Sequence, residues 1–241
     1  MTNWFAGCSG FHYKHWKELF YPAGVPMRKW FAYYNQHFST LELNVTFYRF
    51  PRLEYLEPWY NESSPNFIFS AKAPKAITHF KQFHNTQQMI ADVYGTLHEG
   101  LKEKLGCVLF QLPPRLAYNN ERLHRIAESM NPDFNNVLEC RHESWWNEEV
   151  YKTLANYNIT FCGMSHPLLP NAVVHTNSNM YYRFHGVPNL YSSLYSVHDL
   201  QTFAAEINSN QQVSKVFVYF NNDIGGSAIV NARQMNELIK T

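Results

Sequence analysis

The stretch "TLELNVTFYRFP", residues 40–51, has the branched and aromatic content of a buried β-strand, but two polar side chains interrupt it. Glu42 and Asn44 are two positions apart, so in a strand they point to the same face. The opposite face is apolar and consists of Leu41, Leu43 and Val45. A strand that presents a carboxylate and an amide on one face near its end predicts a pocket at that end.

Seven other short apolar segments resemble this one, and longer amphipathic segments separate most of them. The eight predicted strands cover residues 4–10, 40–47, 67–73, 106–112, 136–142, 159–165, 180–186 and 215–221. The predicted helices cover residues 26–38, 86–105, 119–130, 147–157, 196–209 and about 228–240. Residues that favour helix N-termini open four of them: Thr86, Asn120, Asn147, and Ser196 with Asp199 three positions later.

Eight strands in alternation with helices predict an α/β protein with a TIM-type (β/α)8 barrel, formed by a single domain over residues 1–241. An open doubly wound sheet is the alternative, but no G-x-G-x-x-G motif follows the first strand. The segment between the sixth and seventh strands, residues 166–179, contains two prolines and has no helical periodicity. We therefore expect the sixth helix to be reduced or missing.

Composition restricts the classes of function. Of the 241 residues, 45% are hydrophobic and 16% are charged, which is enough to fill a large core. The net charge of +1 gives no electrostatic reason to expect a nucleic-acid partner. The four cysteines form no C-x-x-C pair, and no run of eighteen apolar residues predicts a membrane span. The start of the sequence lacks the pattern of a signal peptide, so we expect a cytoplasmic protein with no membrane partner.

Polar side chains end most of the predicted strands, where barrels of this type carry their functional groups. They are Glu42, Asn44, Lys72, Gln111, Glu139, Arg141, Arg183, His185, Asn221, Asn222 and Asp223. Buried ion pairs that only compensate one another are the structural alternative. Because six of the eight strands end in this way, we favour a shared ligand pocket.

The residue types in this pocket indicate acid–base chemistry on an anionic ligand. Glu42 and Glu139 are candidate acids or bases, and Lys72, Arg141 and Arg183 are candidates to hold negative charge. Backbone amides in the 225–227 segment before the last helix are a further candidate anion site. A hydrolytic, lyase or isomerase step fits these groups.

A metal site is an open alternative. Five histidines follow predicted strands, namely His12, His79, His142, His166 and His185. However, no H-x-H or H-E-x-x-H motif occurs, and no nucleotide-cofactor motif is present. His37, His98 and His124 fall within predicted helices, where we expect surface or core positions.

Seven segments resemble domain-of-unknown-function family 72, the YecE-like proteins, in the order that the family shows. They are "GCSGFHYKHWKELFYP", "LELNVTFYRFP", "FSAKAPKAITH", "FQLPP", "LECRHESW", "YYRFHG" and "YFNND…NA", which together run from Gly7 to Ala232. The resemblance implies a TIM-type barrel. It also implies recurrent polar positions at Glu42, Asn44, Tyr48, Lys72, His79, Gln111, Glu139, Arg141, Trp145, Arg183, His185 and Asn222.

Two positions depart from the family pattern. Cys8 and Phe11 replace residues of the usual opening, and Ser165 with His166 stand where the family often has an aspartate. The family's similarity to metal-dependent endonucleases implies nucleic-acid binding, with phosphodiester cleavage, as the alternative function.

The residues and the resemblance together predict an enzyme that binds a small polar or anionic molecule, of a phosphorylated or sugar-like kind. We expect Glu42, Glu139, Lys72 and His185 to be catalytic. We expect the ligand-binding residues to be Asn44, Tyr48, His79, Gln111, Arg141, Trp145, Arg183 and Asn222, with no metal ligands.

Overall fold

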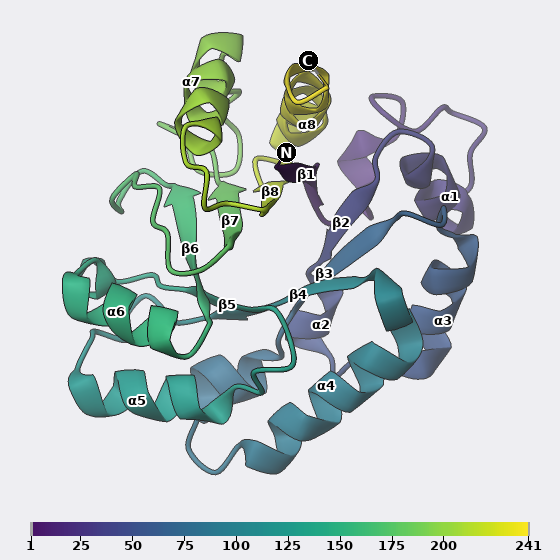
Figure 1. Ribbon diagram of the computed structural model, residues 1–241. Coiled ribbons are helices and arrows are strands. Elements are labelled where there is room, and N and C mark those ends of the chain that lie inside the picture. The colour runs from purple at the N-terminus through teal and green to yellow at the C-terminus, as the bar shows by residue number, and fades with distance from the viewer. Residues whose placement is uncertain (1, 241) are drawn as a thin grey trace.

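The computed structural model describes residues 2–240 and has eight parallel strands that close into a barrel. The strands are β1 (Asn3–Ser9), β2 (Thr40–Leu43), β3 (Ile68–Lys72), β4 (Leu105–Gln111), β5 (Asn136–Glu139), β6 (Thr160–Ser165), β7 (Asn179–Phe184) and β8 (Lys215–Phe220). Helices surround the strands (Figure 1). The (β/α)8 prediction is confirmed.

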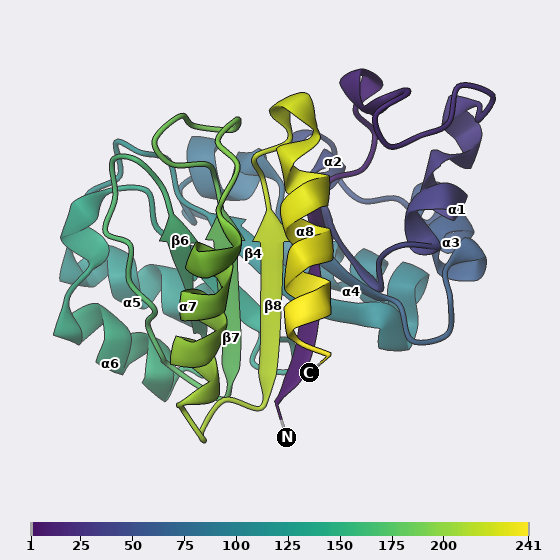
Figure 2. The same ribbon diagram turned by 90° about the horizontal axis from the view of Figure 1, so that it is seen from above.

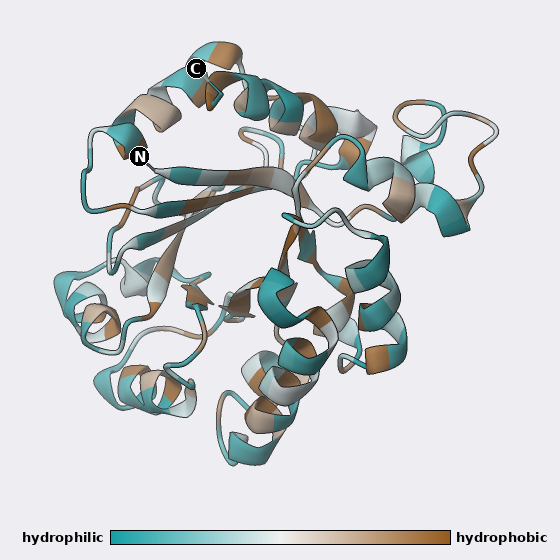
Figure 3. Cartoon of the chain, turned by 45° about the vertical axis from the view of Figure 1, so that its right-hand side comes forward, coloured by the Kyte–Doolittle hydropathy of each residue, from teal (hydrophilic) through white to brown (hydrophobic). Residues whose placement is uncertain are grey.

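Helices follow every strand except β6 in the described chain. They are α1 (Trp30–Asn35), α2 (Val45–Tyr48), α3 (Leu53–Glu62), α4 (Gln87–Leu101), α5 (Asn120–Ser129), α6 (Glu148–Asn156), α7 (Val197–Asn208) and α8 (Ser227–Leu238). Their hydrophilic residues lie mostly on the outer side of the molecule (Figure 3), as expected for helices that bury one face against a sheet. None of the helices that the structure describes has the length and apolar character needed to span a membrane.

Several stretches differ from their predicted structure. The first predicted helix, residues 26–38, is an α-helix only over Trp30–Asn35, and the fifth predicted strand, residues 136–142, ends at Glu139. The second strand ends at Leu43 rather than at residue 47, and the chain turns at once into α2, with helical angles already at Asn44. The helix α3, which contains Pro58 in its interior, is not among the predicted helices.

The predicted helix caps are mostly correct. The side chain of Asn147 accepts the amide of Val150, and Ser196 forms a reciprocal capping box with Asp199. Thr86 occupies the cap position of α4 without a capping hydrogen bond, and the cap of α5 is Asn119 rather than Asn120.

No helix lies between β6 and β7 in the described chain, which confirms the expected gap. Figure 1 shows only loop segments in this sector, between α6 and α7. Side-chain hydrogen bonds hold the loop in place of helix packing. The Thr176 hydroxyl accepts the amide of Phe161 at 2.9 Å and donates to the carbonyl of Ile159 at 2.7 Å.

Side chains fill the inside of the barrel. The lower part is mainly apolar and consists of Phe5, Ile68, Cys107, Leu109, Val137, Cys162, Tyr181, Phe217 and Tyr219. The Phe5 and Phe217 rings stack at 5.0 Å. Above it lies a charged layer, contributed by residues two positions further along several of these strands. The charged layer therefore lies at the carboxyl ends of the strands, opposite the two chain termini (Figure 2).

Candidate functional site

A cavity of about 890 Å³ opens at the carboxyl ends of the strands, where barrels of this class carry their functional groups. Eight of the twelve predicted site residues line it, namely Glu42, Asn44, Tyr48, Lys72, His79, Gln111, Arg141 and Arg183. Glu139 and His185 are fully buried and contact residues of this group. The structure thus brings ten of the twelve together.

Four charged side chains form a continuous chain beneath the cavity. Arg183 bridges both carboxylates, with Nη2 at 2.7 Å from Glu42 Oε1 and Nη1 at 2.8 Å from Glu139 Oε2. Arg141 extends the chain, with Nε at 2.6 Å from Glu139 Oε1. The four groups are at most 9% exposed. Their formal charges sum to zero, which permits two carboxylates to be buried together.

Neutral donors complete the shell around the two carboxylates. The Ser9 and Tyr181 hydroxyls each donate to Glu42 at 2.5 Å. The Gln111 amide donates to Glu139 at 2.8 Å. Ser9 and Tyr181 were not predicted as site residues, although strand parity offered a signal. Tyr181 lies two positions before Arg183 on the same strand face, and Ser9 is the last residue of β1.

The environment of Glu139 favours its ionised form. Burial alone would raise the pKa of this carboxyl, but the guanidinium groups of Arg141 and Arg183 hold the pKa well below its usual value. Glu139 is therefore a permanent anion near neutral pH.

His185 is a neutral imidazole. Burial and the neighbouring Arg141 guanidinium hold the pKa of its ring well below the usual value. Nδ1 lies 3.0 Å from the Asn221 amide nitrogen, and Nε2 lies 3.1 Å from Arg141 Nη2. Nε2 also lies 3.3 Å from Glu139 Oε1. These contacts hold the His185 ring among the Asn221 amide, the Arg141 guanidinium and the Glu139 carboxylate.

Lys72 differs from its charged neighbours. It is 8% exposed, at the end of β3, and its Nζ makes no hydrogen bond or ion pair with the described residues. The ammonium lies over the face of the Phe47 ring, 4.0 Å from its centroid. Burial, together with the nearby Arg183 guanidinium, lowers the pKa of Lys72 to about 7. Near neutral pH this residue interconverts between ammonium and amine.

The outer wall of the cavity is aromatic and basic. Tyr48 and Phe80 are 69% and 72% exposed, and Lys75 Nζ lies 5.3 and 5.5 Å from their ring centroids. His79 is half-buried beneath them, where its Nδ1 lies 2.8 Å from Thr78 Oγ1. Burial and the adjacent Lys72 lower the pKa of His79, so the imidazole is neutral at physiological pH.

Two predicted ligand-binding residues have structural environments instead. Trp145 is fully buried, donates from Nε1 to the carbonyl of Leu116 at 2.7 Å, and does not line the cavity. The Asn222 amide donates to Ser193 O and Asn231 Oδ1, which fixes the loop between β7 and α7. Both residues support the walls of the barrel mouth from outside the cavity.

The 225–227 segment is a turn. Gly225 and Gly226 both have positive φ, and the Gly226 amide bonds to Asp223 O. The Ala228 amide bonds to Asn222 O. One of the amides expected to hold an anion, that of Gly226, is thus used inside the turn.

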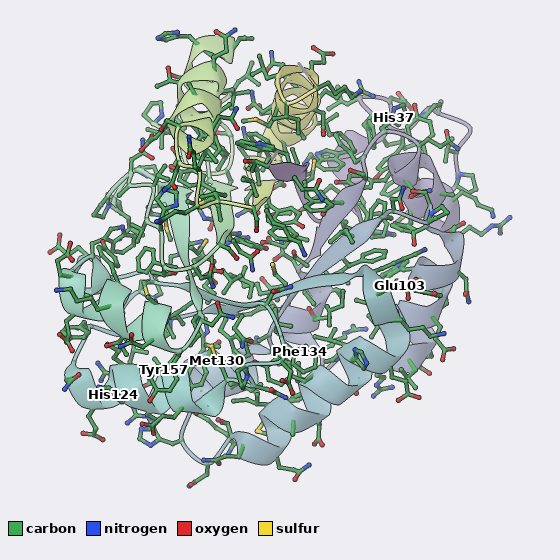
Figure 4. The ribbon with its side chains drawn as sticks, viewed as in Figure 1. His37, Glu103, His124, Met130, Phe134 and Tyr157 are labelled. Atoms are coloured by element: carbon green, nitrogen blue, oxygen red, sulfur yellow. The ribbon has the colours of Figure 1, made fainter. Side chains whose placement is uncertain are left out.

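Histidines and carboxylates do not gather into a metal-binding group. Within residues 2–240, no three or more His, Cys, Asp or Glu side chains are arranged to hold a metal ion. His37, in the turn after α1 rather than within a helix as predicted, and His124, in α5, lie at the periphery of the molecule (Figure 4).

Ser165, at the end of β6, is one of the two residues that stand where the family often has an aspartate, and it has a structural role. Ser165 is buried, and its hydroxyl accepts a hydrogen bond of 2.9 Å from Tyr195. The same Tyr195 oxygen accepts the amide of Gly186. Ser165 thus helps to fix the loop after β7.

A closed parallel barrel with charged side chains at its carboxyl-terminal mouth defines this protein as a TIM-type (β/α)8 barrel. Sequence comparison then assigns the family. Residues 5–241 match the family described as "Protein of unknown function DUF72", and the chain belongs to it.

Relatives and solved structures agree with this assignment. The UPF0759 protein YunF of Bacillus subtilis (strain 168) is 28% identical over 258 residues, which covers 92% of this chain and 90% of the relative. A crystal structure of a DUF72 family protein from Thermotoga maritima matches with a TM-score of 0.86 and 26% identity, over 99% of this chain and 100% of that one. A second, from Enterococcus faecalis, has a TM-score of 0.82 at 20% identity, covers 99% of this chain and 96% of that chain, and supports the fold alone.

Proposed function

We propose that this protein is an enzyme that binds a small anionic molecule in the barrel mouth, with Lys72 as the group that exchanges a proton with it. One observation carries the proposal: Lys72 is a buried cation with no counter-ion, beside a set of charges that already balance. An anionic ligand supplies the missing charge, and an amine with a pKa of about 7 suits proton transfer at physiological pH.

The roles of the other groups follow from their contacts. Glu42 and Glu139, which the sequence suggested as acids or bases, hold Arg183 and Arg141 in place. Arg141 borders the cavity and adds a second positive group for the ligand. Charged groups fixed in this way stabilise negative charge without reorganisation during reaction. A lyase or isomerase step that begins with proton removal fits this arrangement better than hydrolysis.

Anion binding provides the test. We expect inorganic phosphate to raise the melting temperature more than sodium chloride does at equal ionic strength, because a ligand that binds only the folded state stabilises it. The Lys72→Met variant should lose this difference. Lys81→Met, at an exposed position outside the cavity, should retain it. Equal stabilisation by phosphate and chloride in the wild type would contradict the proposal.

Nucleic-acid binding is the second candidate, and the outer wall favours it. Exposed aromatic rings interleaved with basic side chains, as at Tyr48, Lys75 and Phe80, suit the stacking of unpaired bases. Retention of single-stranded DNA that falls steeply with salt, and that weakens in a Tyr48→Ala variant, would support it. Absence of retention at low salt would remove it.

A further inference from the structure

Two lysines are buried among residues 2–240, Lys72 and Lys104, and their environments differ. Lys104 Nζ donates to Tyr60 O at 2.8 Å, Ser63 O at 3.0 Å and Ser63 Oγ at 2.8 Å. An ammonium has three N–H donors, so Lys104 is fully satisfied as a cation. Lys72 has no such acceptor among the described residues and instead lines the cavity. Lys104 thus has a hydrogen-bond acceptor for each of its N–H groups, and Lys72 has none among the described residues.

The surroundings of Lys72 suit a free amine. A neutral amine has a nucleophilic lone pair, and lysines that are desolvated beside another cation are the ones that attack carbonyl groups. Arg183 supplies that neighbouring cation, while Glu42 and Glu139 are occupied by guanidinium groups and form no ion pair with Lys72. Glu139 and Glu42 act on the Lys72 nitrogen only at a distance, and their effect is smaller than that of burial and Arg183.

From this geometry we infer that Lys72 Nζ forms an imine with the ligand, and that the substrate is a small aldehyde or ketone bearing a carboxylate or phosphate group. This inference rests on the proposed function and names its substrate class. It makes Lys72 a covalent catalyst, whereas proton exchange alone would leave it unmodified.

The step balances without any further reactant. The Lys72 ammonium first releases one proton to water, and the neutral nitrogen attacks the carbonyl carbon. A nitrogen proton moves to the carbonyl oxygen to give a carbinolamine. The released proton then returns to that hydroxyl, the C–O bond breaks, and water leaves. One ammonium and one carbonyl compound thus give one iminium and one water, with the single positive charge conserved.

The pocket accommodates the charge of the product. The face of the Phe47 ring, 4.0 Å from Nζ in the free protein, remains beside the iminium nitrogen and stabilises a cation there. The anionic group of the substrate lies within a cavity that Arg141 and Lys75 also line. An iminium draws electrons from the adjacent carbon, so a proton on that carbon becomes acidic, in keeping with a lyase or isomerase reaction.

Reductive trapping tests the inference. The intact wild-type protein is incubated at neutral pH with glyoxylate and sodium cyanoborohydride, which reduces an iminium to a stable secondary amine. Peptide mapping by mass spectrometry then measures carboxymethyl addition at each lysine. We expect Lys72 to react at least about tenfold faster than any other lysine, because the amine fraction at pH 7 falls roughly tenfold for each unit of pKa above 7. Lys104 and the exposed Lys81 serve as internal controls.

The outcomes distinguish this inference from the proposed function. Preferential modification of Lys72, competed by added phosphate, supports both. Labelling of Lys72 no faster than of Lys81, in a protein that phosphate still stabilises, overturns the imine and leaves the anion site. If Lys72 is not labelled preferentially and phosphate does not stabilise the protein, the imine and the anion site are both overturned.

Discussion

At the scale of single residues, the barrel mouth contains two buried basic side chains, Arg183 and Lys72, whose pKa values are shifted in opposite directions. Arg183 contacts both Glu42 and Glu139, and these carboxylates raise the pKa of its guanidinium although burial opposes them. Lys72 has no carboxylate partner, and burial lowers its pKa to about 7. The paired guanidinium is held in its charged form, and the unpaired amine changes its protonation near neutral pH.

The first prediction concerns Lys72 and pH. Its pKa falls from 10.5 in the unfolded chain to about 7 in the folded protein, so the unfolded state binds more protons between these values. Stability therefore rises with pH over this window, and the wild type carries its full penalty, on the order of 5 kcal/mol, below pH 7.

Lys72→Met should remove that penalty. We expect the variant to melt above the wild type at pH 6, with the difference shrinking toward pH 10, as measured by circular dichroism. Lys104→Met provides the matched control, because it deletes three hydrogen bonds and should be destabilised at both pH values. A Lys72→Met effect that is independent of pH would show that the ammonium is not the cause.

The second prediction concerns Arg183. Arg183→Met leaves Glu42 and Glu139 buried without their shared partner, and we expect a loss of about 3–5 kcal/mol in the free energy of unfolding by urea. Arg115→Met, at an exposed position, should stay within about 0.5 kcal/mol of the wild type.

The pH dependence of the Arg183→Met loss follows from Glu139. In the wild type its folded pKa is depressed, so its contribution to stability is present above the unfolded pKa and is lost as the solution becomes more acidic. The gap between wild type and variant should therefore narrow at acidic pH. A loss below about 1 kcal/mol at pH 7 would mean that the carboxylates find other partners.

At the scale of elements, a residue of α1 bridges β1 and β2 by hydrogen bonds at the point where these two strands separate. The two strands pair only at Cys8 with Leu41 and Ser9 with Glu42. Just before this point the Tyr34 hydroxyl, from α1, accepts the Cys8 amide at 2.9 Å and donates to Thr40 O at 3.0 Å. The tyrosine thereby completes the hydrogen bonding where the strands diverge.

The third prediction tests this junction. A Cβ on Gly7 would lie 2.3 Å from Thr40 O and 3.0 Å from the Tyr34 oxygen, so Gly7→Ala should cost about 1–3 kcal/mol. Gly95→Ala is the matched control. Gly95 is an exposed residue of α4 with open space around it, and the substitution should stabilise by about 0.5–1 kcal/mol. Urea unfolding measures both, and equal effects would contradict the close approach at Gly7.

At the scale of the whole molecule, closure leaves the described sheet without an edge. The first and last strands pair from Asn3 with Lys215 to Cys8 with Phe220, and α8 covers the seam, where Asn236 Nδ2 donates to Ala6 O at 2.9 Å. A closed barrel has no strand with a free row of backbone groups. The first strand, β1, and the last helix, α8, therefore both take part in closing the barrel.

The fourth prediction follows from closure. Amide hydrogen exchange at the seam of β1 and β8 should be as slow as at β4, since these two strands pair continuously from Asn3 with Lys215 to Cys8 with Phe220. Mass spectrometry of peptides after timed exchange makes the comparison, with the loop between β6 and β7 as the fast-exchanging control. Exchange of β1 far ahead of β4 would indicate that the seam opens separately from the rest of the barrel.

The sequence by itself determined the number, order and parallel arrangement of the strands, the missing sixth helix, and most of the residues at the mouth. These features depend on periodicity, on helix-capping residues and on the two-residue alternation of strands, all of which act over short distances along the chain. The pairs Glu139 with Arg141 and Arg183 with His185 were predicted for this reason, and both contribute to one site.

Only the tertiary structure decided which charges pair and which do not. Arg183 meets Glu42 from 141 positions away, and Lys72 receives no partner although both carboxylates belong to the same charged layer. Trp145 and Asn222 satisfied the sequence criteria for a site, yet they support its walls. Burial and pairing are set by how strands distant in sequence approach one another, and these two quantities fix the protonation of each group.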